Sequence, residues 1–446
     1  ALKGDPAATS KLAESLSAWP GNSTRALAAT KEKLAGFVAG GQLGIFTNGY
    51  WGHPAMKLSP EVNLLALSHY LQALEFQRKA NQIVGILGGK TPHIQNVAVG
   101  GVMNAINLDS LATLNMDRLY MLKSLFDEVI PFVQQVYFPD ACAIAGFYPE
   151  WFDIGSGVRN YLAVPDLPTD TASTAFDLPG GTIFDGDLAG VRRISGARDE
   201  YFRKGVVEDV THAWYKGNGG PRHPWKGETN PDYTDFQDEG KYSWVKAPRF
   251  DGKPMQVGPV SNILVGYALQ HELTRKWTDL ALARVSAIAQ RPITVDKLHS
   301  TMGRYLARAI RTAVLSELAV RHWEMLAGNI GKGDSSSFRA PGFPKEAVEG
   351  VGVHEAPRGT LSHWVVVKDG TVVNYQAVVP TTWNASPRDA QDVPGPYEAA
   401  LLKNPVADPE KPLEILRTIH SFDPCMACAC HTLDVEGRTI ATVKVL

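Results

Sequence analysis

The sequence predicts an α+β protein that is mainly α-helical, with a long-helix bundle core and irregular β hairpins at its periphery. Three observations lead to this class. Apolar residues recur at helical spacing over several long segments, short β-rich runs gather near the C-terminal end, and a central segment rich in Gly, Pro and aromatic residues separates them. A composition of 44% hydrophobic residues, with a formal net charge of −2, is sufficient for a sizeable globular core.

Charge and hydropathy exclude several classes of protein. A sequence pI of about 6.7 offers none of the basic surface typical of nucleic-acid binding. No window holds the ~18 uninterrupted apolar residues of a membrane-spanning helix, and no signal-peptide pattern is present, so we expect membrane contact only through partners. The chain begins at Ala1 within a helix-and-loop pattern and without an initiator Met, and we therefore expect a fragment that lacks its N-terminal portion.

Helices are predicted where apolar residues recur three and four positions apart. The predicted helices cover residues 9–20, 23–39, 61–87, 116–136, 261–289, 296–327, 397–404 and 410–420. A Gly-Gly pair ends the second of them, and Pro60 stands at the start of the third. Arginines of the sixth, among them Arg304, Arg308 and Arg311, are interpreted as a solvated or interhelical face rather than a binding patch.

β structure is predicted in three places. Residues 150–255 read as an irregular, ordered excursion with short hairpins, such as one at Asp251-Gly252. Asp369-Gly370 separates two Val-rich runs and is a strong hairpin signal. The tail 432–446 has a hairpin pattern with Glu436-Gly437 at its turn. The whole chain, 1–446, is interpreted as one large unit with a helical core (about 9–140 and 261–330), the excursion (about 150–255), a C-terminal region (about 350–431) and the tail (432–446).

A possible nucleotide-binding loop at Gly88-Gly89-Lys90-Thr91 is rejected. A phosphate-binding loop needs Gly-x-x-x-x-Gly-Lys-Ser/Thr between a strand and a helix. Val84 occupies the position of the first Gly, and the element before the motif is a predicted helix.

Three of the four cysteines lie in one short stretch, Cys425, Cys428 and Cys430, and His431 follows directly. Two thiolates at a Cys-x-x-Cys spacing can present both sulfurs to one soft metal ion. The stretch is open to three interpretations: a redox pair, a local zinc site, or half of a metal site whose other ligands lie elsewhere. The remaining cysteine, Cys142, has no cysteine near it in the sequence.

The stretch, with the Asp-Pro before it, resembles the C-terminal signature of the large, catalytic subunit of nickel–iron hydrogenases, in particular the membrane-associated uptake type. Further blocks in family order extend the resemblance over essentially the whole chain. These blocks are Gly49-Tyr50-Trp51-Gly52-His53-Pro54, Gly88-Gly89-Lys90-Thr91-Pro92-His93-Ile94-Gln95-Asn96, Glu355-Ala356-Pro357-Arg358-Gly359 and Tyr375-Gln376-Ala377-Val378-Val379-Pro380-Thr381-Thr382-Trp383-Asn384.

The resemblance implies the reversible splitting of H2 into protons and electrons at a Ni-Fe centre. H2 is a weak acid and a poor ligand, so it must be polarised between a metal and a base. By family position, Cys425 would be a terminal nickel ligand and Cys428 would bridge nickel and iron, while iron carries CO and CN ligands. The family's other Cys-x-x-Cys pair would lie upstream of Ala1, so this fragment alone is expected to be inactive.

Four further residues match positions around the family's metal pair. Arg358 would polarise the site and donate a hydrogen bond to cyanide, and Asp423 would pair with Arg358. Pro357 would line a dry pocket, and Thr381 would supply a donor to cyanide. Each position also has a structural interpretation, as a tether for the Arg–Asp pair and as a turn residue for Thr381.

The resemblance also implies a Mg2+ site, partners and a location. His431 and the backbone carbonyl of Ala377 would bind Mg2+, although magnesium usually prefers oxygen ligands. Cys430 departs from the family pattern and is interpreted as a packed or oxidation-sensitive thiol. The implied partner is a small subunit with iron–sulfur clusters, exported together with this chain to the periplasmic side of the inner membrane.

Maturation is implied as well. A chaperone would assist metal insertion, and an endopeptidase would remove a tail after His431, so 432–446 reads as an unprocessed extension. The alternative function is a metal-free relative that serves as a scaffold subunit in an electron-transfer complex. The presence of both Cys425 and Cys428 argues against that alternative.

Overall fold

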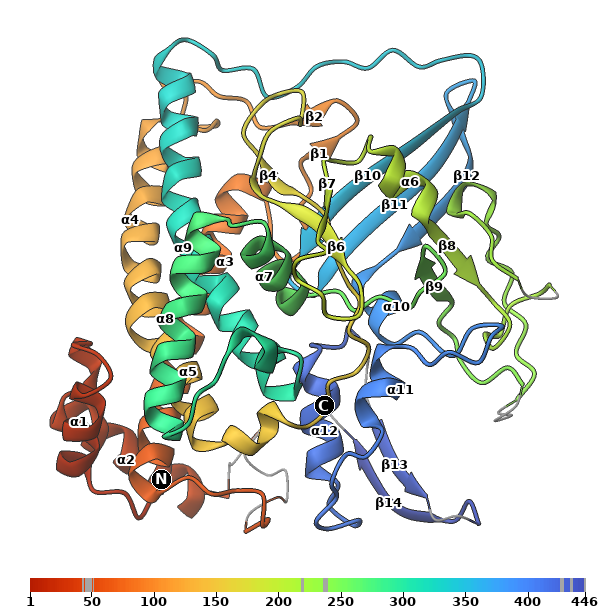
Figure 1. Cartoon of the computed structure of the whole chain (residues 1–446). Coiled ribbons are helices and arrows are strands. Elements are labelled where there is room, and N and C mark those ends of the chain that lie inside the picture. The colour runs from red at the N-terminus through yellow and green to blue at the C-terminus, as the bar shows by residue number, and fades with distance from the viewer. Residues whose placement is uncertain are drawn as a thin grey trace. The chain divides into compact units, whose positions relative to one another are not determined.

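Figure 1 shows the computed structural model, which describes residues 1–41, 44, 50, 52–217, 220–235, 240–425, 429–433 and 436–444. Helices hold many more of these residues than strands, and the sheets are small, which confirms the mainly helical α+β class. The chain forms two compact units. The first comprises Ala1–Gly49, Lys57–Ala143 and Thr312–Gly342, and the second comprises Tyr50–Met56, Ile144–Arg311 and Phe343–Leu446.

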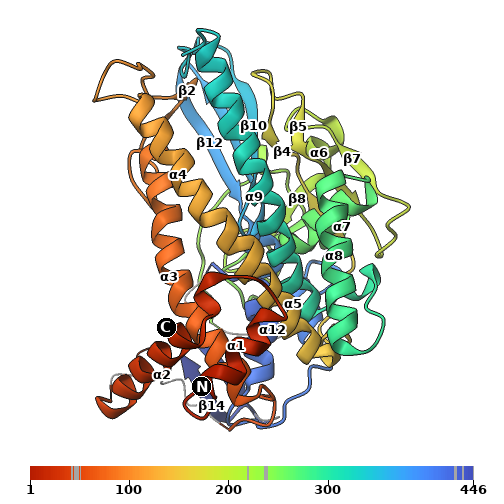
Figure 2. The same cartoon turned by 90° about the vertical axis from the view of Figure 1, so that its left-hand side faces the viewer.

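The first unit is built from helices. Its elements are α1 (Pro6–Glu14), η1 (Pro20–Asn22), α2 (Thr24–Ala39), α3 (Pro60–Gly88), β1 (Val97–Ala98), β2 (Gly101–Val102), α4 (Met116–Phe132), η3 (Val133–Tyr137) and the later part of α9 (Thr301–Gly331). Figure 2 shows α3 and α4 side by side. Ile83 of α3 and Leu122 of α4 lie in a shared core, against which Trp323 of α9 packs. The predicted start of α3 is confirmed, since Pro60 is its first residue and the Ser59 hydroxyl accepts the Val62 N–H.

The helix predicted over 116–136 extends further than expected. α4 passes through the π-helical turn η3 into α5 (Phe138–Phe147), which contains Pro139. Proline has no N–H to donate and normally ends a helix. The π turn, with its wider hydrogen-bond step, ends two residues before this proline, and the helix continues through it.

The second unit holds the remaining elements. They are η4 (Pro149–Phe152), β3 (Tyr161–Ala163), β4 (Asp166–Pro168), β5 (Phe176–Leu178), β6 (Gly180–Ile183), β7 (Arg192–Ile194), α6 (Glu200–Gly205), β8 (Val206–Asp209), η5 (Pro224–Lys226), β9 (Ala247–Phe250), α7 (Pro259–Ala268), α8 (Glu272–Ala289), η6 (Val295–Leu298), the first part of α9, β10 (Val348–Ala356), β11 (Gly359–Lys368), β12 (Thr371–Val378), α10 (Pro380–Asn384), α11 (Pro396–Leu401), α12 (Leu413–Ser421), β13 (Ala429–Leu433) and β14 (Thr439–Lys444). The helices predicted at 296–327, 397–404 and 410–420 are therefore present with shifted ends.

The largest sheet is the antiparallel set β10-β11-β12, drawn in blue in Figure 1. The predicted hairpin is confirmed, because Lys368 pairs with Thr371 and both Asp369 and Gly370 have positive φ. Trp364 and Val378 of this sheet belong to a buried core that also includes side chains of α6, β9 and α10.

The single helix predicted over 261–289 is two helices, α7 and α8. Gln270 between them has a φ of 62°, which breaks the helical path. His271 then caps α8, since its Nδ1 atom accepts the Thr274 N–H at 3.4 Å. The break was missed because a histidine cap is outside the usual set of helix-start residues.

The C-terminal tail forms the predicted hairpin in its described part. β13 pairs antiparallel with β14, and His431 lies opposite Thr442. Among the described helices, none combines the length with the apolar character needed to cross a membrane.

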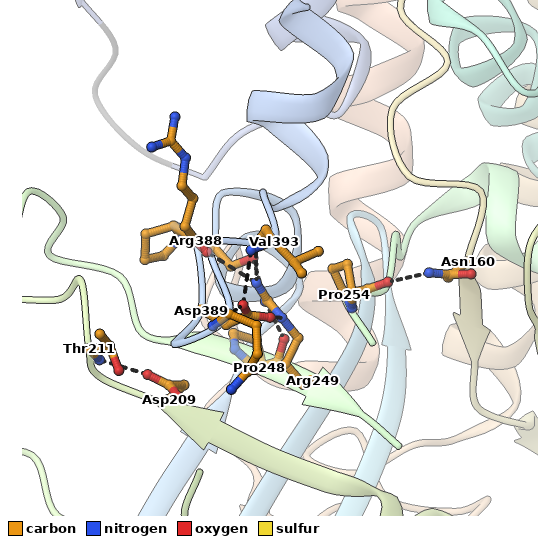
Figure 3. A network of polar contacts seen from close by, with 12 residues as sticks. Asn160, Asp209, Thr211, Pro248, Arg249, Pro254, Arg388, Asp389 and Val393 are labelled. Carbon is orange, nitrogen blue, oxygen red and sulfur yellow. Dashed lines mark hydrogen bonds and ion pairs between the residues drawn. The ribbon is translucent and has the colours of Figure 1, made fainter. Parts of the chain in front are cut away.

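A buried ion pair stabilises the segment that follows α10 (Figure 3). Arg249 of β9 donates from Nε to Asp389 Oδ2 at 2.7 Å, and both side chains are 3% exposed. The second carboxylate oxygen of Asp389 accepts the N–H groups of Gln391 and Val393, each at 3.0 Å. Arg249 Nη2 also donates to the Val393 carbonyl at 2.9 Å. The pair is fully hydrogen-bonded, so removing one partner would leave a buried charge without compensation.

Asp389→Asn is therefore expected to lower the free energy of unfolding by about 3–5 kcal/mol, the usual cost of breaking a buried pair. Chemical denaturation of the full-length protein measures this. Asp296→Asn is the matched control, because Arg159 and Asp296 are also 2.7 Å apart but are 43% and 68% exposed. The control should cost less than about 1 kcal/mol. Equal losses in the two variants would contradict the role given to burial.

Candidate metal centre

Arg358 lies in a two-residue turn between β10 and β11, where Ala356 pairs with Gly359. Gly359 has a φ of 124°, and a Cβ at that position would lie 2.4 Å from the nitrogen of Gly258. Gly258 has a φ of 123° and caps α7. Only glycine permits this backbone-to-backbone contact. The Arg358 turn is therefore fixed against the start of α7.

The predicted pairing of Arg358 with Asp423 is present. Arg358 Nε donates to the Asp423 carbonyl at 2.9 Å, and Nη2 lies 3.3 Å from Asp423 Oδ1. Asp423 follows α12 and has a φ of 58°, which lets its carbonyl and carboxylate both face the guanidinium. Both side chains are 37% exposed, so the pair adds little stability. Its main consequence is to orient Arg358.

Thr381 contacts the cysteine stretch directly. This residue of α10 is 6% exposed, and its hydroxyl oxygen accepts the Cys425 N–H at 3.2 Å. The Cys425 thiol is exposed and forms no disulfide. Thr381 thus holds the backbone of Cys425 while its own hydroxyl proton stays available for a second partner.

One side chain joins α10 to the Arg358 turn. Asn384, 1% exposed, donates from Nδ2 to the Val257 carbonyl and accepts the Val257 N–H, each at 3.0 Å. Val257 directly precedes Gly258, which contacts the Arg358 turn. Through this two-way contact, Thr381 and Arg358 are positioned by the same short segment of backbone.

The other predicted site residues are less closely connected. Pro357 is exposed beside Arg358, and Ala377 is exposed near the end of β12, opposite His363. Cys428 lies outside the described residues, as does the side chain of His431. Among the described residues, no cluster of three or more His, Cys, Asp or Glu side chains could hold a metal ion. The metal-binding roles of Cys428, His431 and Ala377 therefore stay predictions.

The arginines of α9 were interpreted incompletely from the sequence. Arg304 and Arg311 are 3% and 6% exposed rather than solvated. Arg304 donates to the Ser421 hydroxyl, two residues before Asp423, and Arg311 donates to the Ala356 carbonyl, two residues before Arg358. Burial lowers the pKa of Arg304 to about 9, so its guanidinium still carries a charge near neutral pH. The spacing of these arginines on one helix face was the available signal.

Glu355, just before the Arg358 turn, was not singled out as a site residue. Its Oε1 atom accepts the Val164 N–H at 2.8 Å and the Thr360 hydroxyl at 2.5 Å. Burial raises the pKa of Glu355, because a charged carboxylate loses hydration there. Its contacts anchor the residues before the turn to the residue that follows β3 and to β11.

The donor set fits half of a soft-metal site. Cys425 offers a free sulfur, which as a thiolate is a ligand for soft metals such as nickel. Asp423 lies two residues before Cys425, and its carboxylate contacts the charged Arg358. Side chains placed behind the direct ligands in this way can orient those ligands and tune the metal.

Comparison with known proteins gives a consistent result. The sequence model of a family described as "Nickel-dependent hydrogenase" matches residues 1–431. The chain is 51% identical over 447 residues to the Hydrogenase-2 large chain of Escherichia coli (strain K12), covering 100% of this chain and 79% of that protein. It is 42% identical over 472 residues to the Uptake hydrogenase large subunit of Bradyrhizobium diazoefficiens, covering 100% and 77%.

Solved structures agree in fold. A reduced, active Ni-Fe-Se hydrogenase from Desulfomicrobium baculatum superposes with a TM-score of 0.68 at 31% identity, over 82% of this chain and 69% of that one. A NiFeSe hydrogenase variant from Desulfovibrio vulgaris Hildenborough gives a TM-score of 0.71 at 27% identity, over 85% and 73%.

The exposure of the cysteines predicts their reactivity. In the full-length chain prepared without nickel, N-ethylmaleimide should label Cys425 at least about 100-fold faster than Cys142, which is 1% exposed. This factor corresponds to a local opening that costs about 3 kcal/mol. Peptide mapping by mass spectrometry, in a Cys428→Ser, Cys430→Ser background, reports Cys425 alone. Similar rates for Cys142 and Cys425 would contradict the structure.

Proposed function

The chain belongs to the nickel-dependent hydrogenase family, and on that premise we propose how its own residues serve the reaction. It is a catalytic large subunit, an oxidoreductase that splits H2 reversibly and heterolytically into protons and electrons. Large subunits of this family pair with a small subunit and carry a Ni-Fe centre. The scaffold alternative is not favoured, because relatives at 51% and 42% identity are hydrogenase large subunits.

Cys425 and Cys428 are the residues proposed to hold the Ni-Fe centre, each as a thiolate ligand. When bound, the centre supplies a soft site at which H2 is polarised. The chain's contribution at Cys425 is positional: the Thr381 hydroxyl holds the backbone while the sulfur stays free. This contact, together with the Arg358–Asp423 pair, is the observation that supports the assignment most directly.

Arg358 is proposed to act by charge and hydrogen bonding. A guanidinium is not deprotonated near neutral pH, so it cannot serve as a free base, but it offers several donors in a fixed plane. Asp423 holds that plane through a backbone and a side-chain contact. Pro357 adjoins Arg358 and is proposed to line a dry pocket once the site is covered.

Thr381 is proposed to donate its free hydroxyl proton to a cyanide ligand of iron, with CO as the companion ligand. His431 and the Ala377 carbonyl are proposed Mg2+ ligands. The hydrogen-bond logic for Thr381 comes from its contact with the Cys425 N–H, which occupies an oxygen lone pair and leaves the proton free.

The proposed partners extend to electron transfer and maturation. Electrons would pass to iron–sulfur clusters of the small subunit on the periplasmic side of the inner membrane. A maturation chaperone and an endopeptidase are proposed to act on the precursor. The family match ends at residue 431, and β14 lies beyond that point, which supports 432–446 as the segment removed.

The cysteine roles are tested in the full-length subunit, produced with its small subunit and maturation apparatus. Cys425→Ser and Cys428→Ser should abolish H2-dependent dye reduction, because a hydroxyl is a poor ligand for a soft metal. Metal analysis should show loss of nickel. Cys430→Ala, the matched control, should keep most of the activity. Equal loss in all three variants would instead support a local zinc-type site.

Arg358→Lys should assemble the centre yet lose about 10²–10³ in turnover, the usual effect of removing one preorganised donor from an enclosed site. The charge is kept, but a planar set of donors becomes a mobile ammonium. Infrared bands of iron-bound CO and CN should survive, with the CN bands shifted. Near-normal turnover would show that Arg358 is only a tether for Asp423.

A further inference from the structure

Three arginines on one face of α9 contact both segments that carry the proposed site. Arg304, Arg308 and Arg311, here called the arginine ladder, are spaced four and three residues apart, so their side chains emerge on the same side of the helix. All three lie in the second unit, as do the Arg358 turn and the Asp423–Cys425 segment.

The first two arginines hold the end of α12. Arg304 Nε donates to the Ser421 hydroxyl at 2.7 Å, and its guanidinium lies 3.9 Å from the centre of the Phe422 ring. Arg308 Nη2 donates to the Ser421 carbonyl at 3.0 Å. Ser421 and Phe422 directly precede Asp423, so these contacts set where the cysteine stretch begins.

The third arginine holds the other segment. Arg311 Nη1 donates to the Ala356 carbonyl at 2.9 Å, and Nη2 donates to the Glu355 carbonyl at 2.8 Å. Both carbonyls belong to the last residues before Pro357 and Arg358. A two-pronged contact to successive carbonyls fixes the direction of the backbone as well as its position.

Stabilising the folded state does not by itself explain why these arginines are buried. Within the described part of the chain, Arg304 pairs with no carboxylate; its hydrogen-bond acceptors are the hydroxyls of Ser421 and Thr301 and the Gly155 carbonyl. Removing a guanidinium from water costs free energy that neutral acceptors repay only in part. Burial accordingly lowers the pKa of Arg304 and of Arg311. An apolar side chain of similar volume would be a less costly filler at position 304. The cost of burying Arg311 is offset in part by the nearby carboxylate of Glu355.

We propose that the arginine ladder is a positioning device for the reaction, in which one rigid face of α9 sets the placement of the Arg358 turn relative to the Asp423–Cys425 segment. This inference rests on the proposed roles of Arg358 and Cys425. A misplacement of about 1 Å in such a site can cost about 10²-fold in rate. The ladder residues touch no reacting group, so they are positioning residues rather than catalytic ones.

The decisive variant is Arg311→Met in the full-length enzyme with its small subunit. Methionine fills the buried volume but leaves two carbonyls without their donor and Glu355 without its nearby positive charge, so the melting temperature should fall. Turnover measured well below that melting temperature should still be about 10- to 100-fold lower, while KM for H2 changes little. Arg321→Lys, at an exposed position of α9, is the control and should leave both quantities unchanged. Normal turnover of the folded variant, measured below its melting temperature, would overturn the proposal.

A second measurement is independent of the metal. In the nickel-free full-length chain, hydrogen–deuterium exchange should increase at 355–360 in Arg311→Met and at 418–425 in Ser421→Ala, which removes an acceptor of Arg304. If Arg311→Met does not fold, Ser421→Ala carries both the exchange and the turnover test. Unchanged hydrogen–deuterium exchange in these two segments would refute the proposal that the arginine ladder positions them. Failure of the wild-type enzyme to oxidise H2 would refute the proposed function and leave the exchange result to be judged separately.

Discussion

The site depends on one close contact between two glycines. A side chain on Gly359 would overlap the backbone of Gly258, so the Arg358 turn can sit on the start of α7 only if position 359 lacks a Cβ; the φ of 123° at Gly258 also favours glycine. From this contact the rest of the geometry follows in two directions. Through Val257 and Asn384 it fixes α10, whose Thr381 holds Cys425; through Arg358 it reaches Asp423. Segments 65 residues apart in the chain are thereby brought to one place.

Local sequence patterns predicted much of the fold. Pro60 marked the start of α3, and Asp369-Gly370 marked the β11–β12 turn, because helix starts and tight turns depend on the residues that form them. The breaks were harder to predict. A positive φ at Gln270 and a π turn before Pro139 depend on contacts made by the folded chain, and neither leaves a local signature of its own.

The sequence nominates candidate site residues but does not predict their geometry. Family blocks pointed to Arg358, Asp423, Thr381 and Cys425, yet no spacing in the sequence predicts that a threonine hydroxyl accepts the Cys425 N–H. The α9 arginines show the converse. Their periodicity was visible, but periodicity cannot separate a solvated face from a buried one when long cationic side chains bind carbonyls.

Two Arg–Asp pairs in the second unit show how burial assigns different tasks to the same chemistry. Both side chains of the Arg249–Asp389 pair are 3% exposed and fully hydrogen-bonded, so water screens their attraction very little and the pair holds the fold together. Arg358–Asp423 is 37% exposed, where water screens most of the attraction. Coulomb attraction grows as the surrounding dielectric constant falls. Excluding water from the second pair would therefore strengthen the attraction between Arg358 and Asp423.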